Sequence, residues 1–146
     1  MTRAERMSAL ALASSAELEE IWATFGQEPD FEWIRQPEFA SVMVRARVSG
    51  NGDAFNLGEV LITRCVIQLA ESQVIGAAYL TGRRRRLATV AALLDALSQL
   101  DEPVGEKLRT AISALPESRK RRREKTESEI VTSQVDFSML LRAEAS

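Results

Sequence analysis

The stretch "VIGAAYLTGRRRRLATVAALLDAL", residues 74–97, decides the fold of this chain, because its apolar pattern changes period at Gly82. Before Gly82 the run is short, apolar and rich in residues that favour strands, and it ends near Thr81. After four consecutive arginines, apolar residues recur at the spacing of one helical face: Leu87, Val90, Ala91, Leu94 and Leu97. A strand joined directly to a packed helix is therefore predicted, with Gly82 as the joint.

Three further apolar runs precede this stretch and predict strands: "FEWIRQ" (31–36), "SVMVRARVS" (41–49) and "EVLITRCVIQLAE" (59–71). The second run alternates, with Val42, Val44, Ala46 and Val48 on one face and Arg45, Arg47 and Ser49 on the other. The third is apolar on both faces near its middle, which indicates a central strand. No link is long enough for a helical crossover, so a four-stranded antiparallel sheet is predicted.

Helices are predicted on both sides of these strands, which makes the fold class α+β. Thr2 with Glu5, and Ser14 with Glu17, have the spacing of capping boxes at the start of two N-terminal helices. The second of these carries one apolar face and stops at Gly26; the face consists of Leu18, Ile21, Trp22 and Phe25. A later short helix stops near Pro116; its apolar residues are Leu108, Ile112 and Leu115.

The chain is predicted to divide at residue 115 into a core domain, 1–115, and an extended helical arm with a tail, 116–146. The arm begins with "ESRKRRREKTESE" (117–129), whose opposite charges at helical spacing favour a solvated helix. The tail is apolar in alternation, which predicts docking onto another chain. Its docking residues are Val135, Phe137, Met139 and Leu141.

Composition excludes several kinds of site. The chain has no histidine and one cysteine, so it lacks the commonest general base and a multi-thiolate metal site. Cys65 lies in an apolar alternation and is predicted to be a buried structural thiol. We expect no metal, no cofactor and no catalysis by this chain alone. A net charge of −2 gives no support for nucleic-acid binding, and the chain has no membrane-span pattern, so a cytoplasmic location is expected.

The arginine run at 83–86 stands where a helix dipole is already positive, which is electrostatically unfavourable unless something offsets it. Solvent, an acidic partner chain or an anionic ligand would each do so. Guanidinium forks beside a helix N-terminus suit phosphate or phosphonate oxygens. The glycine-rich "SGNGDAFNLGE" (49–59) is a second candidate anion nest, but a hairpin connection is the favoured interpretation.

The sequence resembles the PhnG family, a subunit of the bacterial carbon–phosphorus lyase complex that degrades phosphonates. The matching features are Gly50, Gly52, Phe55, Gly58, the pair Thr63-Arg64, the pair Gly82-Arg83, Ala88, "ALLDAL" (92–97) and "VDF" (135–137). Arg84 to Arg86 depart from the pattern. The resemblance implies a multi-subunit assembly in which the G, H and I subunits, with an ATP-binding-cassette-like L subunit, couple alkylphosphonate to the ribose C1 of ATP with release of adenine. It assigns the nucleosidase chemistry to the I subunit.

Two functional hypotheses remain open. In the first, the chain is an accessory subunit that binds and shapes the nucleosidase subunit, with ATP as a substrate of the complex. In the second, it is an independent small module that binds an anion or nucleic acid. Under the favoured first hypothesis, neither nucleic acid nor a membrane is a partner. The residues predicted to bind an anion or a partner are Thr63, Arg64, Gly82 and Arg83, with Arg83 the most important.

Overall fold

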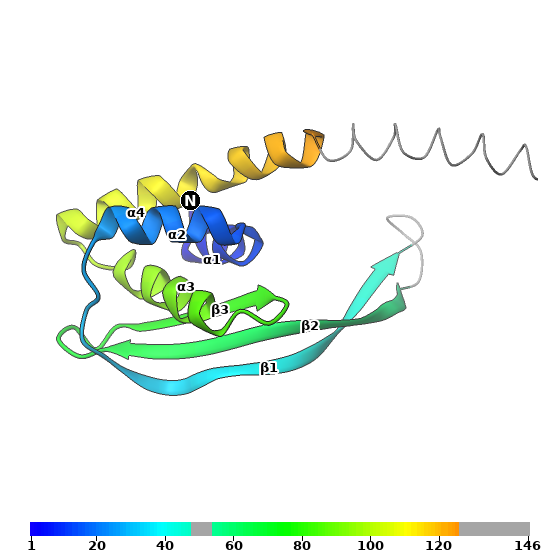
Figure 1. Ribbon diagram of the computed structural model, residues 1–146, viewed down its shortest axis with the longest axis horizontal. Coiled ribbons are helices and arrows are strands. Elements are labelled where there is room, and N and C mark those ends of the chain that lie inside the picture. Colours follow the sequence, from blue (N-terminus) through cyan, green and yellow to red (C-terminus); the bar gives the residue numbers. More distant parts are fainter. Residues whose placement is uncertain (48–53, 126–146) are drawn as a thin grey trace, which may run out of the picture. The chain divides into compact units, whose positions relative to one another are not determined.

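The computed structural model describes residues 1–47 and 54–125, except for the side chains at 46, 47 and 54–57. The chain divides into two units, Met1–Leu115 and Pro116–Ser146. The first unit contains helices and strands in this order: α1 (Arg3–Leu12), α2 (Ser15–Phe25), β1 (Phe31–Arg47), β2 (Ala54–Leu69), β3 (Ile75–Thr81), α3 (Arg85–Leu97) and α4 (Pro103–Ser113) (Figure 1). The α+β class is as predicted.

The sheet has three antiparallel strands in the order β1-β2-β3, so the prediction of four strands is wrong. Residues 31–36 and 41–47, predicted as parts of separate strands, both lie in β1. Register shifts on both sides of Arg35 bulge this strand around Pro37. Pro37 does not end the strand because β1 lies at the edge of the sheet, where a missing N–H donor and a bulge are tolerated.

β2 is the central strand, as its apolar middle predicted. It pairs with β3 only from Ile62 to Gln68, whereas it pairs with β1 along almost its whole length. Residues 41–47 and 54–61 therefore continue beyond β3 as a two-stranded ribbon, which we call the hairpin arm (Figure 1). Of the glycine-rich stretch 49–59, residues 54–59 belong to β2, and Gly50 and Gly52 lie outside the described residues.

Both predicted capping boxes are confirmed. Thr2 and Glu5 exchange side-chain and backbone hydrogen bonds at the start of α1, and Ser14 and Glu17 do the same at the start of α2. Gly26 ends α2 in the left-handed conformation, with φ +80°, as its C-cap role requires. These local signals position α1 and α2 as two short helices with a sharp turn between them.

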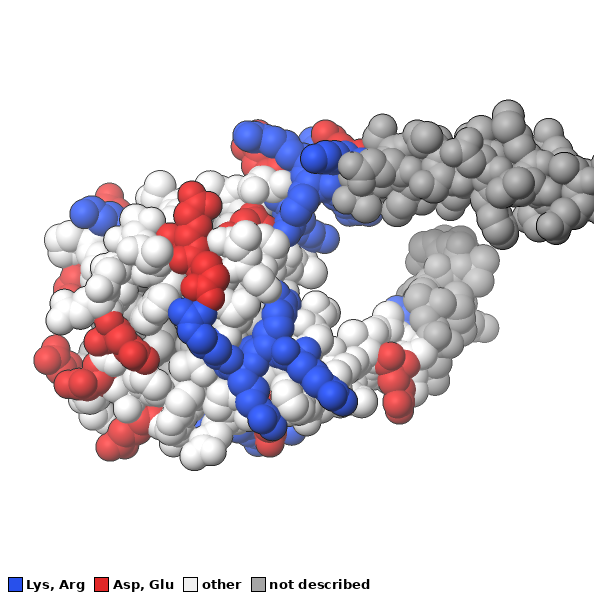
Figure 2. Space-filling view, in the orientation of Figure 1, with Lys and Arg blue, Asp and Glu red and all other residues white. Residues whose placement is uncertain are grey.

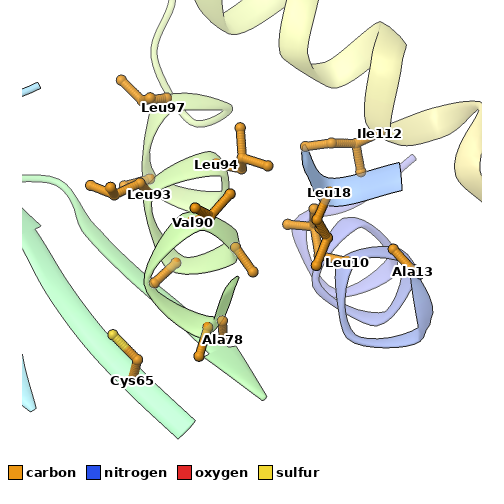
Figure 3. Packing of buried hydrophobic residues seen from close by; sticks show 14 of the residues in the cluster. Leu10, Ala13, Leu18, Cys65, Ala78, Val90, Leu93, Leu94, Leu97 and Ile112 are labelled. Carbon is orange, nitrogen blue, oxygen red and sulfur yellow. The ribbon is translucent and has the colours of Figure 1, made fainter. Parts of the chain in front are cut away.

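Helix α3 forms the middle layer of the first unit, between the sheet on one side and α1, α2 and α4 on the other (Figures 1 and 3). Every residue from 90 to 97 is buried. Figure 3 shows Leu94 on the side of α3 that faces Leu10, Leu18 and Ile112, while Cys65 lies on the sheet beneath. A helix covered on both sides is apolar nearly all round, which goes beyond the single apolar face that the spacing predicted.

Gly76 allows α3 to approach the sheet closely. A Cβ atom at this position of β3 would lie 2.0 Å from the carbonyl oxygen of Ala92 and 2.8 Å from the Cβ of Ala96. The small residues on both elements therefore set the spacing between β3 and α3. This close contact packs α3 tightly against β3.

Side chains cover part of the outer edge of β3. The Oδ2 atom of Asp95 accepts hydrogen bonds from the backbone N–H of Ala77, at 3.0 Å, and from Arg3, at 2.9 Å. The Gln99 amide donates to the carbonyl of Ile75 at 2.9 Å. Backbone groups at the start of this edge are thus already satisfied by side chains from α1 and from the end of α3, which blocks pairing with another strand.

In α4 and just after it, the predicted apolar residues Leu108, Ile112 and Leu115 are buried in the core. In the second unit, residues 116–125 are helical, and Glu117 pairs with Arg121 at 3.6 Å as predicted. The predicted docking residues lie outside the described part of the chain; they are Val135, Phe137, Met139 and Leu141. Among the described residues, no helix has the length and apolarity needed to cross a membrane.

Candidate functional site

Thr63 fixes the joint between β3 and α3. This β2 residue has no exposed surface. Its hydroxyl donates to the carbonyl of Gly82 at 2.6 Å and accepts from the backbone N–H of Arg84 at 3.0 Å. Gly82 has φ +81°, a conformation that favours glycine, and its own N–H donates to the carbonyl of Leu61 at 2.8 Å. The structure thus brings together two predicted site residues, Thr63 and Gly82, inside a hydrogen-bonded latch.

Arg83 and Arg85 stack on one aromatic ring. Their guanidinium carbons lie 5.6 Å and 4.3 Å from the centroid of Phe39, a residue of β1. Phe39 is 37% exposed and both arginines are exposed, so the group faces solvent. A guanidinium that stacks on a ring keeps its N–H edge free for a carboxylate or phosphate. No ion pair to either arginine is found among the described residues.

The two remaining arginines of the run both contact α2, and Arg84 also contacts the end of β3. Arg84 donates to the carbonyl of Thr81 at 3.0 Å and to the hydroxyl of Ser15 at 3.3 Å, and burial lowers the pKa of this arginine from its usual value. Arg86 pairs with Glu19. Figure 2 shows basic side chains gathered over the joint, with acidic ones beside them. Carbonyl, carboxylate and aromatic contacts therefore offset the unfavourable position of the run at the start of α3.

Arg64 lies on the other face of the sheet from Thr63, because successive residues of a strand point to opposite faces. Its Nε donates to Glu38 at 2.6 Å, and Glu38 also contacts Arg35 at 3.2 Å. The pair Thr63-Arg64 therefore does not form one cluster with Arg83. Arg64 contributes to a cross-strand charge network on the face of the sheet that α3 does not cover.

Sequence reasoning did not single out Phe39 or Arg85. Phe39 becomes a neighbour of Arg83 because it pairs with Thr63 across β1 and β2, and Thr63 holds the joint. Such a register between strands separated by a hairpin is not visible in residue spacing. Arg83 and Arg85 are alternate residues next to a strand, and this spacing is the one signal that they share a side.

Cys65 is fully buried, as predicted. Burial raises the pKa of its thiol to about 11, with a hydrogen bond to Thr89 acting in the opposite direction. A thiol in this state is a poor nucleophile, because the thiolate is the reactive form. Within residues 1–47 and 54–125, no group of three or more acidic or cysteine side chains is placed to hold a metal ion.

A cavity of about 580 Å³ lies near the end of β2 that is remote from the joint. Its lining includes four carboxylates and no lysine or arginine. The acidic residues are Glu28, Asp30, Glu71 and Glu102. Like charges repel, so this cavity is unsuited to a triphosphate or a phosphonate. Attraction for anions in the first unit is concentrated at the arginine run instead.

Fold and site together define a small α+β protein that presents a fixed cationic surface and whose single thiol is buried. The chain belongs to the PhnG family, since the family model described as "Phosphonate metabolism protein PhnG" matches residues 1–143. It is similar to the protein named alpha-D-ribose 1-methylphosphonate 5-triphosphate synthase subunit PhnG of Rhizobium meliloti (strain 1021), with 34% identity over 144 residues. The alignment covers 97% of this chain and 90% of the relative. The predicted family resemblance is thereby confirmed.

Proposed function

We propose that this chain is an accessory subunit of an assembly that makes ribose 1-alkylphosphonate 5-triphosphate during phosphonate catabolism, within a carbon–phosphorus lyase complex. The observation that carries the proposal is the similarity to a synthase subunit over 97% of the chain. A product with a triphosphate on C5 and a phosphonate on C1 implies that a nucleoside triphosphate, ATP, is a substrate of the assembly. A phosphonate oxygen then forms a bond to C1 as the bond from C1 to adenine breaks.

In this proposal the chain acts by shaping a partner's site and not by supplying a reactive group. It has no histidine, and its single cysteine is buried with a raised pKa. A sugar centre with cation-like character reacts with whichever nucleophile is positioned next to it. A subunit that excludes water from that centre would favour the phosphonate as nucleophile without adding a catalytic residue.

The latch formed by Thr63 and Gly82 supports a positioning role for these two residues, because it fixes where Arg83 leaves the joint. Arg83 then meets a carboxylate of the partner or an oxygen of the substrate. Arg64 contributes from the opposite face, where Glu38 already orients it. Rigid presentation of a guanidinium lowers the entropy lost on binding.

The partner in this proposal is chiefly the nucleosidase subunit of the complex, and the assembly works in the cytoplasm. Nucleic acid is not a partner. The acidic cavity and the net charge of −2 favour this view, because a nucleic-acid surface needs a continuous positive stripe. The predicted tail residues, 135–141, would add a second contact to the same partner.

The test is to prepare the synthase subunits with and without this chain and to supply ATP and methylphosphonate. Adenine, ribose 5-triphosphate and the ribose phosphonate product are then quantified. We expect the phosphonate product only when the chain is present, and the chain to co-purify with the nucleosidase subunit. Equal product yield without the chain would overturn the proposal. Salt-dependent binding of the isolated chain to unrelated DNA would favour the independent module instead.

A further inference from the structure

The hairpin arm exposes apolar side chains on both of its faces. Val42 and Met43 are adjacent in β1 and point to opposite faces, yet they are 41% and 50% exposed. Phe39, at the base of the arm, is 37% exposed. In the part of the first unit that the structure describes, Val42 and Met43 lie where β2 pairs with β1 alone, and Arg85 of α3 covers Phe39 in part. A strand that faces water normally places polar residues on its open side.

The arm also lacks neighbours along its edges. β1 is an edge strand, and β3 does not reach past Ile62, so residues 58–60 of β2 have only β1 beside them, while the carbonyl of Leu61 accepts the N–H of Gly82. A two-stranded ribbon is at best marginally stable in water without a third strand or a helix to pack on. Apolar residues and unpaired backbone groups together are a liability for a protein that works alone. These exposed apolar residues and unpaired backbone groups therefore indicate that another molecule covers the arm.

The charges around the arm indicate what covers it. Arg83 and Arg85 stand on Phe39 at its base, and Arg45 is exposed on the arm itself. Within the described residues, no ion pair is found for any of these three arginines. The one acidic residue among the described side chains of the arm is Glu59, which pairs with Met43 across the strands. Three cations against one carboxylate leave the arm and its base positive.

We propose that the hairpin arm is the docking element of this chain, inserted into an apolar groove of a partner protein whose rim carries aspartate or glutamate. The groove walls contact Val42 and Met43, and the rim carboxylates bind Arg83 and Arg85 at the base. This proposal deepens the proposed function and rests on it, because the partner is another subunit of the same assembly. It places the arginine run at the border of an interface between subunits.

The apolar residues of the arm and the arginines at its base contribute to binding in different ways. Apolar burial supplies affinity, and a desolvated guanidinium fixes register, since it needs a carboxylate at a defined place. The ring of Phe39 contributes by holding both guanidiniums in position before binding. A phosphate ligand would satisfy the arginines alone and would leave Val42 and Met43 in water, so a protein partner explains more of the surface.

The experiment uses the full chain, tagged and co-expressed with the other synthase subunits, and measures how much of each subunit co-purifies. Met43→Asp and the double change Arg83→Glu with Arg85→Glu are expected to reduce recovery of the partner at least tenfold. Two matched controls should stay within twofold of the unchanged chain. They are Ile34→Asp, at an equally exposed apolar position of β1 outside the arm, and Lys107→Glu, an exposed cation of α4.

A photo-crosslinker locates the contact independently of affinity. Benzoylphenylalanine in place of Met43 should crosslink to a partner subunit on irradiation, whereas the same group in place of Ile34 should not. Equal recovery with Met43→Asp, or crosslinking from position 43 to a second copy of this chain, would overturn the docking proposal and leave the proposed function standing. If the unchanged chain recovers no subunit, both proposals are overturned. The docking proposal would also be overturned if the double variant Arg83→Glu with Arg85→Glu lost binding to DNA or polyphosphate but recovered as much partner as the unchanged chain.

Discussion

The latch at Thr63 makes a quantitative prediction. Thr63→Val keeps the shape of the side chain but removes a hydroxyl that makes two hydrogen bonds, at 2.6 and 3.0 Å. The carbonyl of Gly82 and the N–H of Arg84 would then be left without their partner at partly buried positions. Each lost bond of this kind costs roughly 1–2 kcal/mol, so we expect a loss of about 2–4 kcal/mol in the free energy of unfolding. For a chain of this length, that corresponds to a fall in Tm of roughly 6–15 °C.

Urea and thermal unfolding, followed by circular dichroism, measure this effect. Thr63→Ser is the first control, because it keeps the hydroxyl and removes one methyl group, at a cost of about 1 kcal/mol. Thr24→Val is the second, since it removes a hydroxyl that bonds Glu20 on an exposed face of α2 and should change stability by less than about 0.5 kcal/mol. If Thr63→Val unfolds at the same denaturant concentration as the unchanged chain, or if Thr63→Ser is equally damaging, the latch does not act as described.

Four other predictions concern the core and the chemistry. Gly76→Ala should destabilise the fold by about 3 kcal/mol or more, because its Cβ would collide with the backbone of Ala92, and an unchanged urea midpoint would contradict this close approach. Cys65 should resist alkylation at pH 8 until the chain is unfolded, as mass spectrometry can show. Because burial raises its pKa from 9.0 to about 11, the neutral thiol contributes stability that is present below pH 9 and is lost as the pH rises toward 11; Cys65→Ala should remove this pH dependence. Finally, the purified chain alone, given ATP and methylphosphonate, should release no adenine by chromatography, and turnover that persists through repurification would refute this.

Local signals predicted the helices well, because capping residues and apolar spacing act within a few residues of each other. Thr2 with Glu5, Ser14 with Glu17, and Gly26 all do what their spacing indicated. The strands of the sheet were predicted less well. Pro37 interrupts the apolar pattern of the sequence, but β1 continues through it because β1 is an edge strand. Residue spacing does not reveal which strand lies at the edge of a sheet.

The candidate site shows the same limit. Gly82 was predicted as the joint from the change of period, and the structure confirms it. The greater importance given to Arg83 over its neighbours stays a prediction, but the structure gives Arg83 a companion in Arg85. Both stand on Phe39, more than forty residues earlier in the chain. The register between β1 and β2 brings Phe39 close to the two arginines. This register cannot be read from the spacing of residues in a single sequence.

The side chains that bond the outer edge of β3 also determine where further strands can add to this sheet. Asp95 and Gln99 occupy backbone groups at one end of its outer edge, and Arg84 occupies the carbonyl of Thr81 at the other. Within the described residues, a new strand has room beside β1 and beside the part of β2 that extends past β3. A sheet that grows by repeated addition of strands needs open edges on both sides of each molecule, and side chains close both ends of the β3 edge. The closed β3 edge thereby lowers the tendency of a chain with an exposed apolar ribbon to form open-ended fibres.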